Sequence, residues 1–369
     1  MKIAIDISQV AYENTGVANY TSELVKNLLK QDKKNQYLLF GYSLRREYII
    51  NKFFSTLSLL NSNVQWKSFR IPQSAANFLW NRLHQFPLEK LIGKFDIYHS
   101  SDWIQIPSSA KKITTVHDLV VYKFPQTSDP NIVETQKIRL KHVKNECNLT
   151  IADSNSTKND LLEVLDFDPN KIRVVYPGIN KGFKKINDHL IFNILRKYNI
   201  TQPYILSVGS NDPRKNIKKI VSAVKKFEKR TALVIVSSSG WGEKFTEDQG
   251  IKILHNIKTQ DLPAIYSAAE MFIYPSLYEG FGLPVIEAMK CGCPVISSER
   301  GSLKEITDNS ALLVNPESEM EIFQAIVKIF KNNKYKKDLI KSGYLNAERF
   351  SWEDSAKKII SIYEELNNL

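Results

Sequence analysis

The chain has 369 residues, 43% of them hydrophobic, and this length suggests two domains of ordinary size. No apolar run approaches the roughly 18–20 residues of a membrane span, and the first residues, Met1–Ile7, have the pattern of a strand rather than of a signal peptide. The Cys291-x-Cys293 pair has no histidine near it and makes a poor metal site. Together with Cys147, these residues predict buried thiols in a reducing cytoplasm.

Positive charge is concentrated in the N-terminal part. The net charge is +12, and residues 1–150 carry 20 Lys and Arg against 12 Asp and Glu. This excess favours anionic partners, such as phosphorylated substrates or an acidic membrane surface, and a solvated lysine-rich surface is the alternative. Basic helices with aromatic residues at 45–54 and 77–86 could contact such a membrane, but helices that pack on a core have the same pattern. No nucleic-acid-binding motif is present, so nucleic acid is not an expected partner.

Strand and helix patterns alternate through the first half of the chain. Strands are expected at 3–7, 37–40, 64–69, 96–100, 112–116, 149–152 and 172–175, and helices at 20–29, 45–60, 75–92, 131–146 and 156–165. Pro87 is expected to kink or split the third helix, and Ser156 to cap the fifth. Turn formers and charges at 176–185 mark a domain boundary.

The alternation restarts in the second half. Strands are expected at 204–208, 233–237, 251–254, 271–274, 294–297 and 311–314, with helices between them and a last helix at 352–366. Two such series predict two doubly wound, Rossmann-like α/β domains facing across a cleft, because ligands of this fold bind at the carboxyl ends of parallel strands. The predicted domains are 1–180 and 181–350, and the final segment is 351–369.

The most informative stretch is Pro275–Ser298, which has the pattern strand, glycine loop, short helix, strand. Gly280 and Gly282 allow a sharp turn, and Pro284 suits the first turn of a helix. A glycine loop that leads into a helix N-terminus can bind an anion through unpaired backbone N–H groups.

Two carboxylates bracket this loop, Glu279 before it and Glu287 one turn into the helix. Carboxylates repel phosphate, so they are expected to bind hydroxyl groups on either side of it. A ligand with a sugar, a diphosphate and a ribose would satisfy the anion site and both carboxylates, although a buried strand–helix turn with two capping glutamates would look the same.

The motif Glu-Gly-Phe-Gly-Leu-Pro-x-x-Glu-Ala-Met resembles the signature of the retaining glycosyltransferases of family 4, which have the GT-B fold. The resemblance implies that Glu279 contacts hydroxyls of the donor sugar and that Glu287 holds the ribose. It also implies that the backbone of Gly280, Phe281, Gly282 and Leu283 approaches the diphosphate, and that the last helix crosses back to the N-terminal domain.

Arg214 and Lys215 lie between the strand at 204–208 and a helix that starts near Ile217. At a strand end they could bind a diphosphate, or they could be two exposed basic residues of a loop. The family resemblance implies the first role. Many relatives have Arg directly after the strand glycine, where this chain has Ser210, and the Arg-Lys-Asn order resembles a mannosyltransferase-like branch instead.

Four further residues are site candidates. Gly16 lies between the first strand and helix and resembles the family's first loop, whose backbone approaches donor and acceptor, although it could be a simple turn glycine. His117 ends the strand at 112–116, and the resemblance implies a place close to the donor sugar, as a transition-state contact or positioning group. Asn256 and Ile257 follow the strand at 251–254, and in relatives this loop borders the nucleotide base.

The sequence therefore predicts a cytoplasmic retaining hexosyltransferase, with possible peripheral contact to the inner face of a membrane. It would move a hexose from GDP-mannose, or from a UDP-sugar as second choice, to a saccharide or lipid-linked acceptor of cell-surface synthesis. No metal and no cofactor is expected, because Arg and Lys replace the metal charge and Asp166-Phe-Asp168 has the pattern of a turn. A sugar-nucleotide epimerase or hydrolase of the same fold stays open as an alternative.

Overall fold

A computed structural model describes residues 1–13, 15–57, 59–61, 63–201, 203–227, 231–238 and 250–369. The chain forms two compact units. The N-terminal unit comprises Met1–Pro125, Pro130–Gly178 and Ser351–Leu369, and the C-terminal unit comprises Gln126–Asp129 and Ile179–Phe350.

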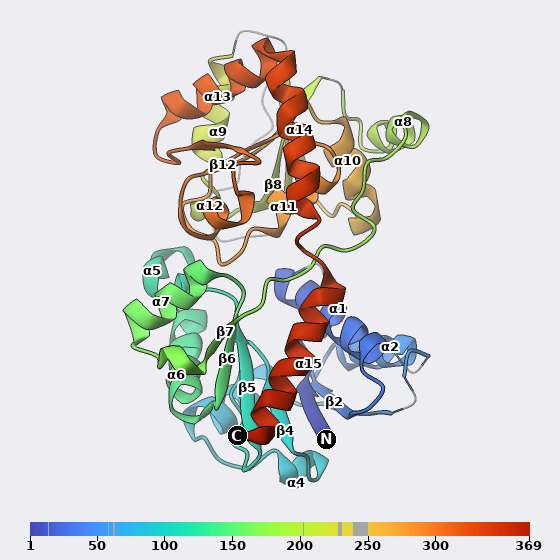
Figure 1. The fold of residues 1–369 in the computed structure, drawn as a ribbon, viewed down its shortest axis with the longest axis vertical. Helices are drawn as coiled ribbons and strands as arrows, with labels where there is room; N and C mark the ends of the chain where they lie inside the picture. Colours follow the sequence, from blue (N-terminus) through green and yellow to red (C-terminus); the bar gives the residue numbers. More distant parts are fainter. Residues whose placement is uncertain (14, 58, 62, 202, 228–230, 239–249) are drawn as a thin grey trace. The chain divides into compact units, whose positions relative to one another are not determined.

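The N-terminal unit is built on a seven-stranded parallel sheet with the strand order β3-β2-β1-β4-β5-β6-β7 (Figure 1). The strands are β1 (Lys2–Asp6), β2 (Gln36–Tyr42), β3 (Val64–Phe69), β4 (Ile97–Ser100), β5 (Lys111–Val116), β6 (Leu149–Ala152) and β7 (Ile172–Val174). The order reverses at β1, an interior strand of the sheet, and this reversal is the topological switch point of a doubly wound fold. The carboxyl ends of β1, β4, β5 and β6 therefore lie side by side along one edge.

Helices cover both faces of this sheet. They are α1 (Gly16–Gln31), α2 (Glu47–Leu57), α3 (Gln73–Ala76), α4 (Glu89–Ile92), α5 (Val120–Lys123), α6 (Pro130–Glu146), α7 (Asn155–Leu165) and α15 (Trp352–Asn368). Figure 1 shows α1 and α15 in the N-terminal unit. Ile3 and Ile5 belong to the core cluster that includes residues of these two helices, whereas Ala4 belongs to the cluster on the other face, as the alternation of a strand requires. The last helix of the chain thus completes the core of the N-terminal unit.

Two details of the N-terminal unit differ from the sequence-based expectation. The helix expected at 75–92, with a kink or split at Pro87, consists of α3, a π-helical segment at Asn77–Arg82 and α4. His84 and Phe86 have left-handed backbones (φ 51° and 65°), so the chain leaves the helix before Pro87. The cap of α7 is Ser154 rather than Ser156, because the Ser154 hydroxyl accepts the Thr157 N–H.

The C-terminal unit has a six-stranded parallel sheet with the order β10-β9-β8-β11-β12-β13. The strands are β8 (Tyr204–Ser210), β9 (Ala232–Ser238), β10 (Ile251–Leu254), β11 (Met271–Tyr274), β12 (Val295–Ser298) and β13 (Leu312–Val314). The helices are α8 (Asp188–Lys197), α9 (Ile217–Lys225), α10 (Leu262–Ala268), α11 (Leu283–Lys290), α12 (Gly301–Thr307), α13 (Glu319–Lys331) and α14 (Asn333–Ala347). The predicted pair of Rossmann-like α/β domains is confirmed.

The sequence analysis missed α12 and α14. The buried face of α14 includes Gly343, Asn346 and Ala347 beside Leu339, so small and polar residues hide its apolar period. Among the described residues, none of the helices combines the length and the apolar character that crossing a membrane requires.

Candidate active site

The glycine loop joins β11 to α11 in the C-terminal unit. Gly282 is the N-cap of α11 and has a φ of +111°, which residues with a side chain rarely adopt. A Cβ atom at this position would lie 2.5 Å from Leu303 Cδ2 and 3.1 Å from Ile306 Cδ1. Glycine is therefore required both by the backbone conformation and by the close packing of α12. Gly282, the N-cap residue, has no side chain that could accept a hydrogen bond from the first turn of α11.

Lys215 and Glu279 form the centre of the site. The Lys215 Nζ lies 2.6 Å from Glu279 Oε1 and donates a second hydrogen bond to the Tyr274 hydroxyl at 2.5 Å. Both charged side chains are almost fully buried. Burial alone would raise the pKa of Glu279, but the charges of Lys215 and Arg214 and the hydrogen bonds to the carboxylate together hold the pKa below its ordinary value. Burial alone would lower the pKa of Lys215, but Glu279 and Tyr274 together outweigh burial, so the pKa of Lys215 is raised and the ammonium stays charged.

Arg214 and Asn216 fix the two loops to each other. The Arg214 guanidinium donates to Asp212 Oδ2 and, at 3.2 Å, to the Tyr278 carbonyl, while the Leu277 N–H donates to the Arg214 carbonyl at 2.8 Å. Asn216 has a left-handed backbone (φ 60°), and its side-chain amide donates to the carbonyls of Pro275 and Pro316. The loop after β8 therefore lies against the loop after β11, because these strands are neighbours in the sheet.

Glu287 lies one turn into α11, as expected. Its Oε2 accepts a hydrogen bond from the Tyr266 hydroxyl at 3.2 Å. Burial raises the pKa of Glu287 to about 7, and the Tyr266 hydrogen bond only partly opposes this effect. The carboxyl group is therefore poised to change its protonation near neutral pH.

The remaining loop residues have separate places. Gly280 and Phe281 are buried, and the Phe281 ring packs edge-on against Phe350 with 5.4 Å between centroids, so only its backbone can approach a ligand. Asn256 and Ile257 follow β10, which β9 and β8 separate from β11 in the sheet. Asn256 is exposed with a left-handed backbone (φ 55°).

Gly16 is the first residue of α1 in the N-terminal unit. Thr15 caps this helix by accepting the Ala18 N–H at 3.2 Å. Gly16 is exposed, and a Cβ atom added to it would meet no atom within 4 Å. The packing of the described residues therefore does not require glycine here.

His117 follows β5 and is paired with a carboxylate that the sequence analysis did not single out. Its Nδ1 lies 2.6 Å from Oδ2 of Asp153, the residue after β6, and Asp153 is 4% exposed. Burial lowers the pKa of His117, but the Asp153 charge and hydrogen bond outweigh burial and raise the pKa to about 9. The Tyr20 ring packs edge-on to the imidazole, with 4.6 Å between the centroids.

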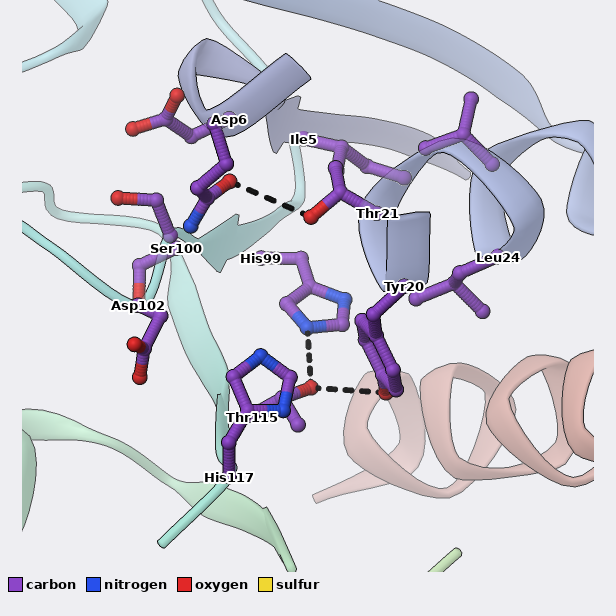
Figure 2. A pocket seen from close by; sticks show the side chains of 13 residues that line it. Ile5, Asp6, Tyr20, Thr21, Leu24, His99, Ser100, Asp102, Thr115 and His117 are labelled. Atoms are coloured by element: carbon purple, nitrogen blue, oxygen red, sulfur yellow. Dashed lines mark hydrogen bonds between the residues drawn. The ribbon is translucent and has the colours of Figure 1, made fainter. Parts of the chain in front are cut away.

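A small pocket with polar groups in its wall lies at this edge of the N-terminal sheet (Figure 2). Its lining includes Asp6, His99, Ser100, Asp102 and His117. Figure 2 shows the His117 ring at the margin of this pocket with one ring nitrogen directed into it. Hydroxyl, carboxyl and imidazole groups suit the hydrogen bonds of a saccharide hydroxyl.

The described residues contain one group with the composition of a metal site, His84, His142 and Glu146, whose ligand atoms lie within 4.8 Å of one another. The two imidazole rings are stacked, with 3.8 Å between centroids and 7° between planes. An ion cannot lie in both of two parallel ring planes, as the ring lone pairs would require. The arrangement fits a histidine pair that shares the Glu146 carboxylate.

The structure thus brings Arg214, Lys215, Glu279 and the Gly280–Leu283 segment together, while Gly16 and His117 belong to the other unit. Tyr266, Tyr274 and Asp153 were missed. Tyr274 and Asp153 stand at carboxyl ends of parallel strands, which was a usable signal. Tyr266 lies inside α10 and looks like any buried aromatic residue.

Comparisons with known proteins agree with this geometry. The model described as Glycosyltransferase Family 4 matches residues 14–183, and the model described as Glycosyl transferases group 1 matches residues 192–346. The chain is 25% identical over 381 residues to "O-antigen chain mannosyltransferase B" of Escherichia coli, covering 99% of this chain and all of the relative.

Two solved structures share the fold over 99% of the chain. They are a sucrose-phosphate synthase of Thermosynechococcus elongatus, with a TM-score of 0.74, 20% identity and 99% of that chain covered, and Anabaena HepE in complex with UDP and glucose, with a TM-score of 0.72, 14% identity and all of that chain covered. The two matched models lie on the two Rossmann-like units and together span most of the sequence. The chain belongs to the family 4 glycosyltransferases of the GT-B fold.

Proposed function

We propose that this protein transfers mannose from GDP-mannose to a hydroxyl of a saccharide or lipid-linked acceptor, with retention of the anomeric configuration. The observation that carries the proposal is the buried Lys215–Glu279 pair beside the glycine loop of α11. It provides a cation for a phosphate and a carboxylate for sugar hydroxyls within one site. The full-length similarity to a mannosyltransferase of O-antigen chains supports the choice of mannose.

In this proposal the C-terminal unit holds the donor. The N–H groups at the start of α11 and the Lys215 ammonium bind the diphosphate, and Arg214 adds charge next to them. Glu279 accepts hydrogen bonds from mannose hydroxyls, and Glu287 accepts them from the ribose. The hydrogen bonds from Lys215 and from the helix N–H groups to the diphosphate become stronger as negative charge develops on this leaving group.

Retention follows a front-face displacement. The bond from the anomeric carbon to the phosphate oxygen breaks while the acceptor oxygen bonds to the same face of that carbon. The departing phosphate oxygen takes the acceptor proton, so no enzyme carboxylate forms a covalent intermediate. Glu279 fits this scheme as a positioning group, because its carboxylate is held by Lys215.

Transfer is proposed to need no metal. The charge that a divalent cation would neutralise is met by Lys215 and Arg214. Turnover measured after exhaustive treatment with EDTA is expected to match that of the untreated enzyme. If EDTA abolishes turnover and added Mg²⁺ or Mn²⁺ restores it, the proposal of metal-independent transfer is overturned.

A UDP-sugar is the second candidate donor, and the shared fold of HepE, whose structure contains UDP and glucose, favours testing it. The functional test offers radiolabelled GDP-mannose, UDP-glucose and UDP-N-acetylglucosamine with a lipid-linked oligosaccharide acceptor. The expected result is acceptor-dependent mannose transfer whose product has the α configuration of the donor. A β-linked product would contradict retention. Loss of the donor sugar without acceptor would indicate an epimerase or hydrolase.

We further propose that the enzyme works in the cytoplasm and contacts the acidic inner face of a membrane, where a lipid-linked acceptor would lie. In support, Tyr48 is 68% exposed and Phe78 is 56% exposed in the basic N-terminal unit. Sedimentation with vesicles that contain anionic lipid is expected to pull down the protein, and equal binding to neutral vesicles would contradict an electrostatic contact.

A further inference from the structure

The His117–Asp153 pair has no role in the transfer scheme above. Its geometry is specific: Nδ1 of the imidazole lies 2.6 Å from the Asp153 carboxylate, and Asp153 is 4% exposed. Among the described residues, Asp153 Oδ1 has no hydrogen-bond partner, and the other carboxylate oxygen, Oδ2, contacts His117 Nδ1. A buried carboxylate without other donors stays ionised most easily when its partner is a cation.

The backbone holds both residues in place. The Thr157 hydroxyl donates to the His117 carbonyl at 3.2 Å, and Ser154, next to Asp153, caps α7 by accepting the Thr157 N–H. The loop after β5 and the start of α7 are therefore joined at the same point where the two side chains meet. The ring orientation is set before any substrate binds.

The two ring nitrogens of His117 have different surroundings. The His117 ring lines the pocket and Asp153 does not, so Nδ1 faces the carboxylate and Nε2 faces the pocket (Figure 2). An imidazole that donates from Nδ1 to a carboxylate either accepts a proton at Nε2 as a base or carries a proton there and donates. The charges around the ring decide between these states.

The groups around the ring favour the cation. Asp153 touches the ring, and Asp102 and Asp118 add negative charge that acts in the same direction. Tyr20 of α1 packs on the ring edge. Burial lowers the pKa of His99 to about 3, so the neighbouring imidazole on β4 stays neutral, and the Arg139 guanidinium of α6 is bound to Asp102.

We infer that Asp153 is a positioning residue which holds His117 as a cation, so that His117 Nε2 donates a hydrogen bond to a substrate oxygen in this pocket instead of removing a proton. The inference rests on the proposed transferase function for its kinetic consequence, but the protonation of the ring can be measured without turnover. A donor suits a retaining transfer, in which the departing phosphate takes the acceptor proton. A base at this position would instead suit an inverting displacement.

The test begins with the charge state. Long-range 1H–15N correlation spectra of the histidine rings, recorded from about pH 6 to pH 10, report the protonation of each nitrogen. His117 is assigned with His117→Gln. Both nitrogens of His117 are expected to stay protonated past pH 8 and to titrate near pH 9. In Asp153→Asn the midpoint is expected to fall by at least about one pH unit, because the amide keeps a hydrogen-bond acceptor but loses the charge.

The kinetic arm uses the pH dependence of mannose transfer. Because the protonated form of His117 is the active one, the wild-type rate is expected to stay constant below the pKa of His117 and to fall as the pH rises through about 9. Asp153→Asn is expected to move this alkaline limb to lower pH. If the midpoint falls from about 9 to about 8, kcat at pH 8.5 drops about threefold, with little change in donor KM. Asp153→Glu is expected to restore part of the limb.

Asp166→Asn is the matched control. Asp166 is the exposed left-handed cap at the other end of α7, a position that Asn also suits, so the limb is expected to stay in place. A wild-type rate that rises between pH 6 and 9, or a His117 that titrates below about 7.5, would overturn the inference, and the second observation needs only the wild-type protein. Titration of the His117 ring near pH 9, together with absent mannose transfer, would refute the proposed function and leave the charge assignment standing.

Discussion

The Lys215 ammonium and the Glu279 carboxylate lie 2.6 Å apart in a site where both side chains are almost fully buried. They come from loops that follow β8 and β11, so the pair closes a gap of 64 residues in sequence. Each charge offsets the desolvation of the other, and removing one partner leaves the other uncompensated.

Lys215→Ala is expected to lower the rate of mannose transfer by about 10²–10³, because it removes a cation from the leaving group. It is also expected to lower the free energy of unfolding by about 3 kcal/mol, because Glu279 stays buried without its partner. The double variant Lys215→Ala/Glu279→Ala should recover much of the stability and none of the activity. Transfer rates and urea unfolding measure the two effects.

Lys304→Ala is the control for this prediction, because Lys304 is an exposed residue of α12. This substitution is expected to change neither the transfer rate nor the free energy of unfolding appreciably. A Lys215→Ala enzyme with the wild-type rate would contradict the role of Lys215 in the leaving-group site.

Two glycine substitutions are expected to have opposite effects on stability. Gly282→Ala should destabilise the protein by about 1–3 kcal/mol, because its φ is +111° and the new Cβ would lie 2.5 Å from Leu303 Cδ2. Gly16→Ala should be neutral or stabilising by up to about 1 kcal/mol, because nothing crowds the position at the start of α1.

Transfer kinetics then separate the roles of these glycines. If the Gly16 backbone approaches substrate, Gly16→Ala keeps its stability and loses activity. Unchanged activity would leave Gly16 as a turn residue.

The protonation of Glu287 should couple to donor binding. Burial raises its pKa to about 7, and ribose hydroxyls would donate to the carboxylate and lower that pKa. Binding of GDP-mannose near pH 6.5 should therefore release protons, and its affinity should weaken as pH falls below about 7. Calorimetry in buffers with different ionisation enthalpies measures the release. Glu287→Gln is expected to abolish it, and proton uptake by the wild type would count against the ribose role.

Glu146 is expected to stabilise the N-terminal unit in a defined pH window. Burial raises its pKa, but hydrogen bonds from His142 and Lys112 outweigh burial and lower the pKa to about 2. The stability that the ionised Glu146 contributes is present above about pH 4.5, the ordinary pKa of the group, and is lost as the pH falls towards 2. The pKa of His142 is raised, mainly by the hydrogen bond to Glu146. The stability that protonated His142 contributes is therefore present below about pH 6.5 and is lost as the pH rises through the pKa of His142 in the folded protein.

Glu146→Gln should therefore cost about 1–2 kcal/mol of unfolding free energy near pH 5.5, and less near pH 3. Urea unfolding followed by tryptophan fluorescence measures the difference. Glu134→Gln, which breaks an exposed pair with Arg82, should cost less than about 0.5 kcal/mol. An equal loss for Glu146→Gln at both pH values would show that the carboxylate charge is not the cause.

The sequence was informative where a local rule decides the structure. Gly282 ends up at the start of α11, and Lys215 meets Glu279, because strand ends and helix starts follow from the alternation of patterns. The partners of these residues were not predictable in this way. Whether Tyr266 reaches Glu287, or Asp153 reaches His117, depends on how elements pack, and a lone Tyr or Asp carries no signal of its partner.

The same reason explains the missed and altered helices. The residues of α12, Gly301–Thr307, begin with glycine and serine and have the composition of a loop, yet Leu303 and Ile306 are buried against the glycine loop. In the segment 75–92, where a kink or split was expected at Pro87, the helix already ends before the left-handed residues His84 and Phe86, and His84 contacts Glu146.

Donor binding tests the central claim most directly, because it asks whether the loops after β8 and β11 hold a nucleotide sugar. Equilibrium dialysis with radiolabelled GDP-mannose is the measurement, on the wild type, on Lys215→Ala and on the control Lys304→Ala, each first shown to be folded. The account predicts saturable binding by the wild type and the control, and at least about tenfold weaker binding by Lys215→Ala. Equal binding by all three proteins, or no binding of any nucleotide sugar by the wild type, would contradict it.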